Sequence, residues 1–290
     1  MGLFFQLVLS GLVIGSTYAV VALGFSLAFT VLRVINFAHP EVFMIGMFGG
    51  LAVASLTKNI YFAILGGMLV AGISGAILER LIIRPLLRRE VLITLIATLG
   101  VGIVLQNSMA LIVGPDSVPF PSLVPRGSVS IWTVSITYRQ LLNFAICAFI
   151  LVVISGYIRL TIWGKATLAV AERPDVAAAF GINVARISQI TLVVASAFGG
   201  LAAVSVGVLY GSASAYVGIL YGLKSFVCML VAGNRFFEGV IIVAIGLGVL
   251  EALVTGYLSS GLRDAVAFSV MIAVLLVRPQ GLFGSYTEKV

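Results

Sequence analysis

RLTIWGKATLAVAERPDVAAAFGINVARI, residues 159–187, decides how this chain is organised, because it is the longest polar interruption on the side that carries most basic residues. Pro174 suits the first turn of a helix, where a missing N–H costs nothing, and Asp175 suits the positive helix N-terminus. Gly181 can end that helix. The pattern predicts about two turns over 174–180 with Phe180 protruding, too short to be stable alone in water. Either a partner surface holds this helix, or it is an incidental turn in a loop, and spacing alone does not decide.

The composition around this stretch is that of a membrane protein. Of 290 residues, 61% are hydrophobic and 9% are charged, with a mean hydropathy of +1.21, whereas soluble domains carry about 25% charged residues. The net charge of +7 does not indicate nucleic-acid binding, because the basic residues lie in short loops on one side of the membrane segments. Cys147 and Cys228 lie inside apolar runs, so we expect packing roles and neither a disulfide nor a metal site.

The apolar segments set the fold. A helix needs about 20 apolar residues to cross the hydrocarbon core. By that measure the segments are 3–29, 40–57, 60–80, 91–113, 138–159, 188–210, 217–233, 238–258 and 264–277. The segments 217–233 and 264–277 are short enough to be half-helices or re-entrant pieces. The sequence predicts an all-α, polytopic transmembrane bundle of eight to ten segments that forms one domain over 1–290.

The basic residues set the orientation. Most of the 17 Lys and Arg residues, including those of the 80–90 and 159–187 loops, fall on one side of the nine segments. Positive loops stay in the cytoplasm. We therefore expect a cytoplasmic C-terminus, an external N-terminus, and an external loop over 114–136 that is rich in Pro and Ser. The N-terminal segment lacks a basic leader and is too long for a signal peptide, so it should remain as the first span.

The first polar cluster lies in RVINFAHPEVFMIG, residues 33–46, at the junction of two apolar segments. Asn36, His39 and Glu41 lie close together there, and an unpaired ionisable group inside a membrane is costly, which suggests function. The alternative is that Asn36 and His39 bond backbone groups freed by a helix break. We place the cluster near the cytoplasmic face, as a candidate inner gate.

Other polar groups interrupt later segments. Thr98 and Gly100 lie mid-span and could present hydrogen-bonding groups to a solute, although threonine more often bonds its own helix. Lys224 and Glu251 are intramembrane charges, and either form an ion pair or act in solute passage. The candidate pathway or gate residues are Asn36, His39, Glu41, Thr98, Gly100, Lys224 and Glu251.

Three sequence motifs together resemble one family. The string AERPDVAAAFGIN, residues 171–183, resembles the cytoplasmic coupling segment of the H-type permease subunit of branched-chain amino acid ABC importers. NFAH at 36–39 resembles a signature of that family, with Pro40 in place of its usual glycine. RPL at 84–86 followed by TLG at 98–100 is also similar to the family. The clearest departure is AGNRFFEG, residues 232–239, where a potential Arg235–Glu238 pair and two aromatic residues replace small residues.

The resemblance implies a fold, a function and partners. It implies an ABC importer permease fold in a bacterial inner membrane, a pathway for branched-chain or other small amino acids, and ATP bound on a separate ATPase subunit. The implied partners are a second permease subunit, two ATPase subunits, an external solute-binding protein and membrane lipid. The residues that it assigns to ATPase coupling are Ala171, Glu172, Arg173, Pro174, Asp175, Ala178, Phe180, Gly181 and Asn183.

The sequence leaves two rival functions open. An ion-coupled secondary transporter could use His39, Glu41 or Glu251 as a proton relay. A channel could be lined by the glycine-rich segments. No nucleotide-binding, metal-ligand or nucleophile motif appears in the sequence, so we expect no enzymatic activity and no cofactor on this chain.

Overall fold

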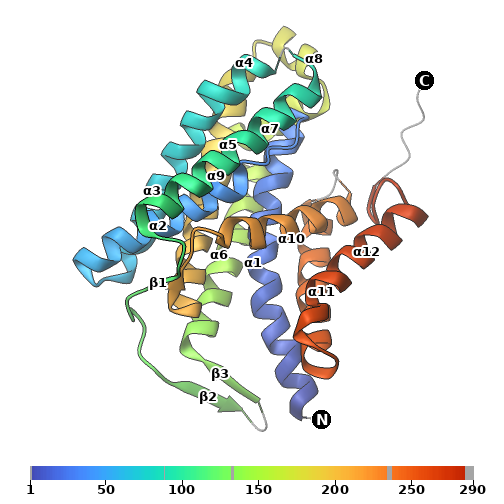
Figure 1. Cartoon of the computed structure of the whole chain (residues 1–290). Helices are drawn as coiled ribbons and strands as arrows, with labels where there is room; N and C mark the ends of the chain where they lie inside the picture. The colour runs from blue at the N-terminus through green and yellow to red at the C-terminus, as the bar shows by residue number, and fades with distance from the viewer. Residues whose placement is uncertain (1, 88, 132–133, 234–236, 285–290) are drawn as a thin grey trace.

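The protein is described by a computed structural model, which covers residues 2–87, 89–131, 134–233 and 237–284. Within these residues it is a bundle of helices, of which eight are long and apolar enough to cross a membrane. Figure 1 shows α4 and α8 at one end of the bundle, and the N-terminal end of α1 with strands β2 and β3 at the opposite end. The predicted all-α membrane bundle is therefore confirmed.

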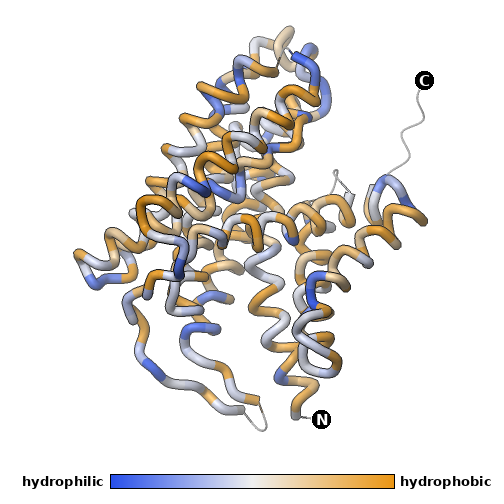
Figure 2. Tube along the Cα trace, in the orientation of Figure 1, coloured by the Kyte–Doolittle hydropathy of each residue, from blue (hydrophilic) through white to orange (hydrophobic). Residues whose placement is uncertain are grey.

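The helices follow the apolar segments closely. Their bounds are α1 (Gly2–Leu32), α2 (His39–Thr57), α3 (Ile60–Leu78), α4 (Arg84–Leu86), α5 (Val91–Val113), α6 (Tyr138–Leu160), α7 (Ile162–Glu172), α8 (Pro174–Ala179), α9 (Val184–Tyr210), α10 (Val217–Ala232), α11 (Phe237–Tyr257) and α12 (Arg263–Val277). Two short elements complete them, a π-helix over Glu79–Ile83 and a 3-10 helix over Ser260–Leu262. Figure 2 shows hydrophilic residues gathered at the α4–α8 end and in the opposite loops, with largely apolar helices between.

Helix α1 forms the centre of the bundle, because glycines let a neighbouring helix approach its backbone. A Cβ on Gly15 would lie 2.7 Å from the Cα of Ile245, and one on Gly11 would lie 2.5 Å from the Cα of Val249. Such contacts give close van der Waals packing where lipid supplies no hydrophobic drive between helices. The glycine pair at 11 and 15 thus sets the α1–α11 contact.

A second tight contact joins α2, α3 and α9. A Cβ on Gly46 would lie 2.6 Å from the Cα of Gly200, and a Cβ on Gly67 would lie 3.1 Å from the carbonyl oxygen of Gly200. The core that these helices share with α1, α6, α10 and α11 is formed mainly by small and aliphatic residues, with aromatic residues such as Phe25 and Phe43 among them. Many apolar side chains on the outward faces of α3, α5 and α12 are exposed, as expected of surfaces that meet lipid or another membrane subunit.

The 114–136 loop contains strands that the sequence did not predict. β1 (Val118–Pro119) pairs with β4 (Ser212–Ala213), which follows α9, and β2 (Ser128–Ile131) pairs with β3 (Val134–Thr137) as an antiparallel hairpin. Gln6 fixes the hairpin to α1, since its side-chain amide donates to the Ser135 carbonyl and accepts from the Ser135 N–H, both at 2.9 Å. The loop is therefore tied to the bundle at two places.

Helix α10 is a half-helix inside the bundle, as the sequence suggested for 217–233. Its 16 residues span about 24 Å, less than the roughly 30 Å of a hydrocarbon core. Figure 1 shows that it lies across the direction of α1 instead of running beside it. Its side chains consequently face both ends of the bundle.

Candidate functional site

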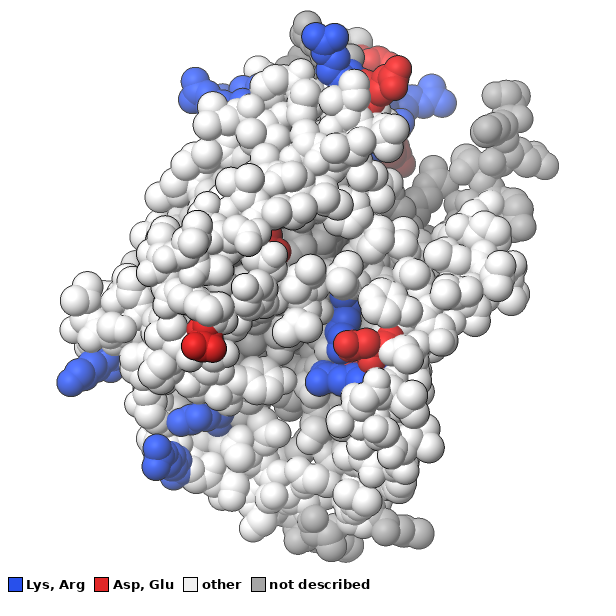
Figure 3. All heavy atoms as spheres, viewed as in Figure 1, with Lys and Arg blue, Asp and Glu red and all other residues white. Residues whose placement is uncertain are grey.

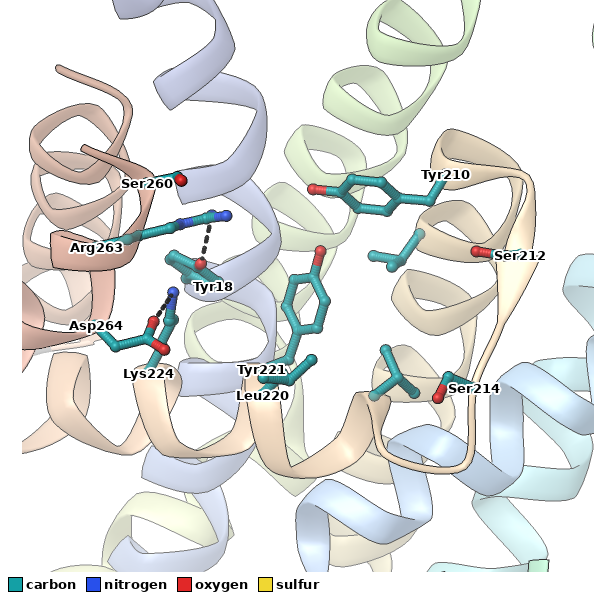
Figure 4. Close-up of a pocket in the computed structure, with 12 residues that line it drawn as sticks. Tyr18, Tyr210, Ser212, Ser214, Leu220, Tyr221, Lys224, Ser260, Arg263 and Asp264 are labelled. Atoms are coloured by element: carbon teal, nitrogen blue, oxygen red, sulfur yellow. Dashed lines mark hydrogen bonds and ion pairs between the residues drawn. The ribbon is translucent and has the colours of Figure 1, made fainter. Parts of the chain in front are cut away.

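A cavity of about 370 Å³ lies on one side of α10, beside the turn that follows α9. Its walls come from α1, from the end of α9 and the following turn, from α10, and from the start of α12. Figure 4 shows the hydroxyls of Tyr210 and Tyr221 pointing into the space opposite Lys224 and Arg263. We call this space the outer cavity.

Four charged side chains form a cluster in the wall of the outer cavity. Lys224 Nζ lies 3.0 Å from Glu251 Oε2 and 2.9 Å from Asp264 Oδ1, and Arg263 Nε lies 2.7 Å from Glu251 Oε2. The Tyr18 hydroxyl donates to Glu251 Oε2 at 2.9 Å. Two cations therefore face two carboxylates. Figure 3 shows basic and acidic side chains side by side in a recess among uncharged atoms.

This cluster contains the ion pair that was one of two predictions for Lys224 and Glu251, while their role in solute passage stays a prediction. Lys224 and Glu251, predicted separately as intramembrane charges, are brought together as an ion pair. Sequence reasoning missed the other members, Tyr18, Arg263 and Asp264. The signal that could have found two of them is the Arg-Asp dipeptide at the start of the last apolar segment, in a chain where charges are rare.

A second cavity, of about 180 Å³, lies across α10 from the first. We call it the inner chamber. Residues of α10 that share one helix face line the outer cavity, namely Val217, Leu220, Tyr221 and Lys224. The opposite face lines the inner chamber through Ile219, Gly222, Leu223 and Phe226. Helix α10 is thus a partition between a charged space and a mostly apolar one.

The inner chamber contains one of the predicted gate residues. Glu41, on the first turn of α2, lines it beside Pro40, while α1 contributes Phe25, the α1–α2 connection contributes Phe37, and α5 contributes Leu99, Gly102, Ile103 and Gln106. Pro40 occupies the first turn of α2, where its ring is tolerated, and a Cβ on Gly222 would collide with that ring. The proline that departs from the family signature therefore packs directly against α10.

Asn36 and His39 support the turn that leads to Glu41. The Asn36 Oδ1 accepts a hydrogen bond from the Ala38 N–H at 3.1 Å, which is the backbone-bridging use weighed from sequence. The His39 ring is buried against Phe25, with ring centroids 5.1 Å apart, and neither of its nitrogens has a hydrogen-bond partner among the described residues. Neither residue lines the inner chamber.

Thr98 and Gly100, the two candidates on α5, have different surroundings. The Thr98 hydroxyl donates to the Leu95 carbonyl at 3.0 Å and accepts from the Phe37 N–H at 3.3 Å, so it braces the α1–α2 connection. A Cβ on Gly100 would meet no atom within 4 Å, and Gly100 lines neither cavity. The structure therefore does not bring Gly100 to the other pathway candidates.

Residues 159–187, which we call the coupling segment because they contain the residues predicted to contact an ATPase, are more helical than expected. The short helix predicted from Pro174 is present as α8, and its end is fixed by Gly181, whose φ of 85° suits glycine. The Ile182 N–H bonds the Ala177 carbonyl at 3.0 Å, which completes the helix end. The sequence did not predict α7, whose first turn is capped by the Thr161 hydroxyl.

Helix α8 is accessible from outside the bundle. Of its six residues only Ala177 is buried, while Val176 is 44% exposed and Phe180, just beyond its end, is 83% exposed. Asn183 caps the start of α9, since its side chain accepts from the Arg186 N–H at 3.0 Å. The remaining residues assigned to coupling, Ala171, Glu172, Arg173, Asp175 and Ala178, lie on or beside the same exposed turn.

Arg33, which the sequence analysis did not select, connects the coupling segment to the turn that carries the candidate gate residues. Arg33, at the end of α1, donates from Nη2 to the carbonyls of Ala171 at 3.0 Å and Glu172 at 2.8 Å. Arg33 adopts a left-handed φ of 53°, which is uncommon for a residue with a side chain. The turn that leads from α1 to α2 is thus joined to the C-terminus of α7.

The departure at 232–239 is only partly described. Arg235, expected to pair with Glu238, lies outside the described residues. Glu238 bonds Arg159, the first residue of the coupling segment, so it contributes to the contact between that segment and α11. Gly239 remains closely packed, because a Cβ there would lie 2.6 Å from the Phe283 ring.

Comparison with known proteins places these features in a family. Residues 7–275 match the model of a protein family described as the permease component of branched-chain amino acid transport systems. The high-affinity branched-chain amino acid transport system permease protein LivH of Salmonella typhimurium strain LT2 is 33% identical, over 97% of this chain and 96% of that protein. BraD of Pseudomonas aeruginosa, a permease protein of the same description, is 32% identical over the same shares.

Solved structures agree at the level of the fold. PsaBC from Streptococcus pneumoniae in complex with Fab matches with a TM-score of 0.50 and 16% sequence identity, over 95% of this chain and 91% of that one. The likeness supports the bundle architecture alone. The family match and the full-length relatives go further: this chain belongs to the family of permease components of branched-chain amino acid transport systems.

Proposed function

We propose that this protein is the membrane subunit of an ATP-driven importer for branched-chain or other small amino acids. The relatives that align over nearly the whole chain are permease proteins of branched-chain amino acid transport systems, which supports the substrate class. The family favours this function over the ion-coupled transporter and the channel that the sequence left open. ATP would bind on a partner subunit, with no cofactor on this chain.

The observation that carries the proposal is the accessibility of α8. Phe180 and Val176 present apolar surface at an end of the bundle where hydrophilic residues gather (Figure 2). Burial of a large aromatic side chain is favourable by about 1.5–3 kcal/mol relative to exposure to water. Binding of Phe180 in a complementary groove on an ATPase would gain this free energy. A short helix laid in a groove of another protein is an established mode of recognition.

The contacts of the coupling segment provide a route for movement. A displacement of α8 would act on α7, whose last carbonyls are bonded to Arg33, and Arg33 precedes the turn that carries Asn36, His39 and Glu41. Glu238 connects the start of the segment to α11 in the same way. ATPase closure would thereby shift the α1–α2 turn relative to α10 and change which cavity is open.

The proposal also assigns partners and orientation. The α4–α8 end would be cytoplasmic and would bind two ATPase subunits. The end with the N-terminus and the β2–β3 hairpin would be external and would meet a solute-binding protein. A second permease subunit would cover part of the apolar outer surface, and lipid would cover the rest.

A reconstituted importer tests the function. We would co-purify the chain with a candidate second permease and ATPases, place the complex in liposomes, and measure leucine uptake with and without ATP. Phe180→Glu should reduce both ATPase recovery in the complex and uptake. Phe62→Ala, which truncates another exposed phenylalanine at the opposite end of α3, should leave both unchanged. Uptake by the lone chain driven by a pH gradient would contradict the proposal.

A further inference from the structure

Glu41 differs from the other buried carboxylates of the described chain. Glu79 is fully buried and accepts two hydrogen bonds at 2.9 Å from Arg84. Glu251 accepts hydrogen bonds from Lys224, Arg263 and Tyr18. Glu41 is 5% exposed, its Oε2 has no hydrogen-bond partner, and no ion pair of the described residues includes it.

An isolated carboxylate inside a membrane protein is costly. Its desolvation amounts to several kcal/mol unless a cation or hydrogen-bond donors compensate for it. At Glu79 and Glu251 the fold compensates for that cost with cationic partners. At Glu41 the compensating positive group is missing from the described residues, so the site is open to a cation that arrives from outside the chain.

Glycines let the Glu41 side chain pack closely against its neighbours. A Cβ on Gly218 would lie 2.8 Å from Glu41 Oε2, and a Cβ on Gly102 would lie 3.6 Å from Glu41 Cγ. Glycine at 218, on the first turn of α10, therefore permits the close approach of Glu41 to that helix. Glu41 forms part of the wall of the inner chamber.

The rest of the chamber is apolar. Apart from Glu41 and Gln106, its lining is aromatic, aliphatic, proline or glycine. A Ca²⁺ or Mg²⁺ ion would need about six oxygen ligands, which one carboxylate and one amide do not provide. A ligand with a single positive group and an aliphatic body fits both the charge and the walls.

We propose that the inner chamber binds the aliphatic amino acid during passage, with its ammonium group on Glu41 and its side chain among Phe25, Ile103 and Phe226. This inference rests on the proposed function and adds a site to it. The chamber lies directly across α10 from the outer cavity, so a solute that leaves one cavity past α10 reaches the other. The turn that carries Glu41 is also the turn joined to the coupling segment through Arg33.

Equilibrium binding to the purified importer complex, without the external binding protein, tests the site. Labelled leucine would be displaced by two analogues, leucinol, which keeps the ammonium group, and 4-methylpentanoate, which keeps the carboxylate. We expect leucinol to compete and 4-methylpentanoate to compete poorly. Glu41→Gln should weaken leucine binding by about tenfold or more, because a charged pair in a dry site is lost. Glu90→Gln, which removes an exposed carboxylate at the start of α5, should have no effect.

A second variant keeps the test decisive if Glu41→Gln fails to assemble. Ile103→Ala enlarges the apolar part of the inner chamber and leaves Glu41 in place. It should therefore raise the affinity for phenylalanine relative to that for leucine. An unchanged ratio would overturn the placement of the side chain. Absence of leucine binding by the wild-type complex, wild-type binding by Glu41→Gln, or equal competition by both analogues would overturn the proposal.

Uptake by the same preparations separates this proposal from the function on which it rests. If the complete importer carries leucine with ATP while its binding does not depend on Glu41, the chamber is not the site and the function stands. If the wild-type complex with its binding protein imports no amino acid, the proposed function is wrong. Unchanged binding with lost transport in Glu41→Gln would make Glu41 a proton-carrying or structural group.

Discussion

Arg33 donates a hydrogen bond to the carbonyl oxygen of Glu172 at 2.8 Å, and so joins the end of the central helix to the end of α7. The same guanidinium nitrogen also reaches the Ala171 carbonyl at 3.0 Å. Because the last carbonyls of a helix lack partners within it, an arginine there satisfies them and complements the negative end of the helix. The contact joins the coupling segment to the residue that precedes the turn carrying Glu41.

We predict that Arg33→Ala uncouples the importer. The α7 carbonyls would lose their partner, so movement of α8 would be transmitted less completely to α1 and α2. ATP hydrolysis by the assembled complex should continue, while leucine imported per ATP hydrolysed should fall several-fold. Arg89→Ala, at an exposed arginine near the same end, is the matched control and should keep the wild-type ratio. Parallel loss of hydrolysis and uptake in Arg33→Ala would contradict this role.

We predict that Glu251→Gln destabilises the protein more than Asp264→Asn. Glu251 is fully buried and pairs with both Lys224 and Arg263, whereas the Asp264 side chain is 62% exposed and pairs with Lys224 alone. Breaking a buried pair costs about 3–5 kcal/mol, because an uncompensated charge remains, while exposed pairs contribute about 0–1 kcal/mol. Thermal unfolding of the purified protein at one fixed scan rate measures the difference. Equal midpoints for the two variants would show that the cluster does not stabilise the bundle.

The sequence predicted the elements of this fold better than their contacts. Apolar length alone located the nine segments that became α1, α2, α3, α5, α6, α9, α10, α11 and α12, because a membrane span must satisfy its backbone within one helix. The stop at Gly181 was also predictable from local chemistry. Helix α7 was missed because Lys165 and the polar residues around it are typical of a loop. Its buried face, Thr167 and Val170, becomes evident only from the packing of the folded chain.

The candidate site was less predictable, since it depends on which helices meet. Lys224 and Glu251 are 27 positions apart, and Tyr18 lies 233 positions from Glu251, so no local pattern could join them. That Glu41 has no ion-pair partner among the described residues likewise depends on how the helices pack. What the sequence did provide was the rarity of charge in these segments, which made each charged residue worth considering.

We predict opposite responses from two glycines of α11. A Cβ on Gly248 would collide with the backbone of Gly15 on α1, whereas a Cβ on Gly246 would meet nothing within 4 Å. Gly248→Ala should separate the two helices and cost about 1–3 kcal/mol, as overpacking does. Gly246→Ala should be neutral or slightly stabilising, since alanine is the better helix former by up to about 1 kcal/mol. Thermal unfolding of both variants checks this, and a destabilisation of equal size would mean that α1 and α11 do not pack through Gly248.

The last prediction concerns Pro40 and Gly222, which lie in contact where α2 begins beside α10. A side chain at 222 would collide with the Pro40 ring, so Gly222→Ala alone should destabilise the protein and impair leucine uptake. Pro40→Gly removes the ring, and the double variant should recover much of the loss, with a coupling free energy of about 0.5–3 kcal/mol. A double-mutant cycle on unfolding midpoints and uptake measures that coupling. Gly100→Ala, where no atom lies near, is the control and should not couple with Pro40→Gly. Additive effects of Pro40→Gly and Gly222→Ala would show that the proline ring does not set the distance between α2 and the helix that separates the two cavities.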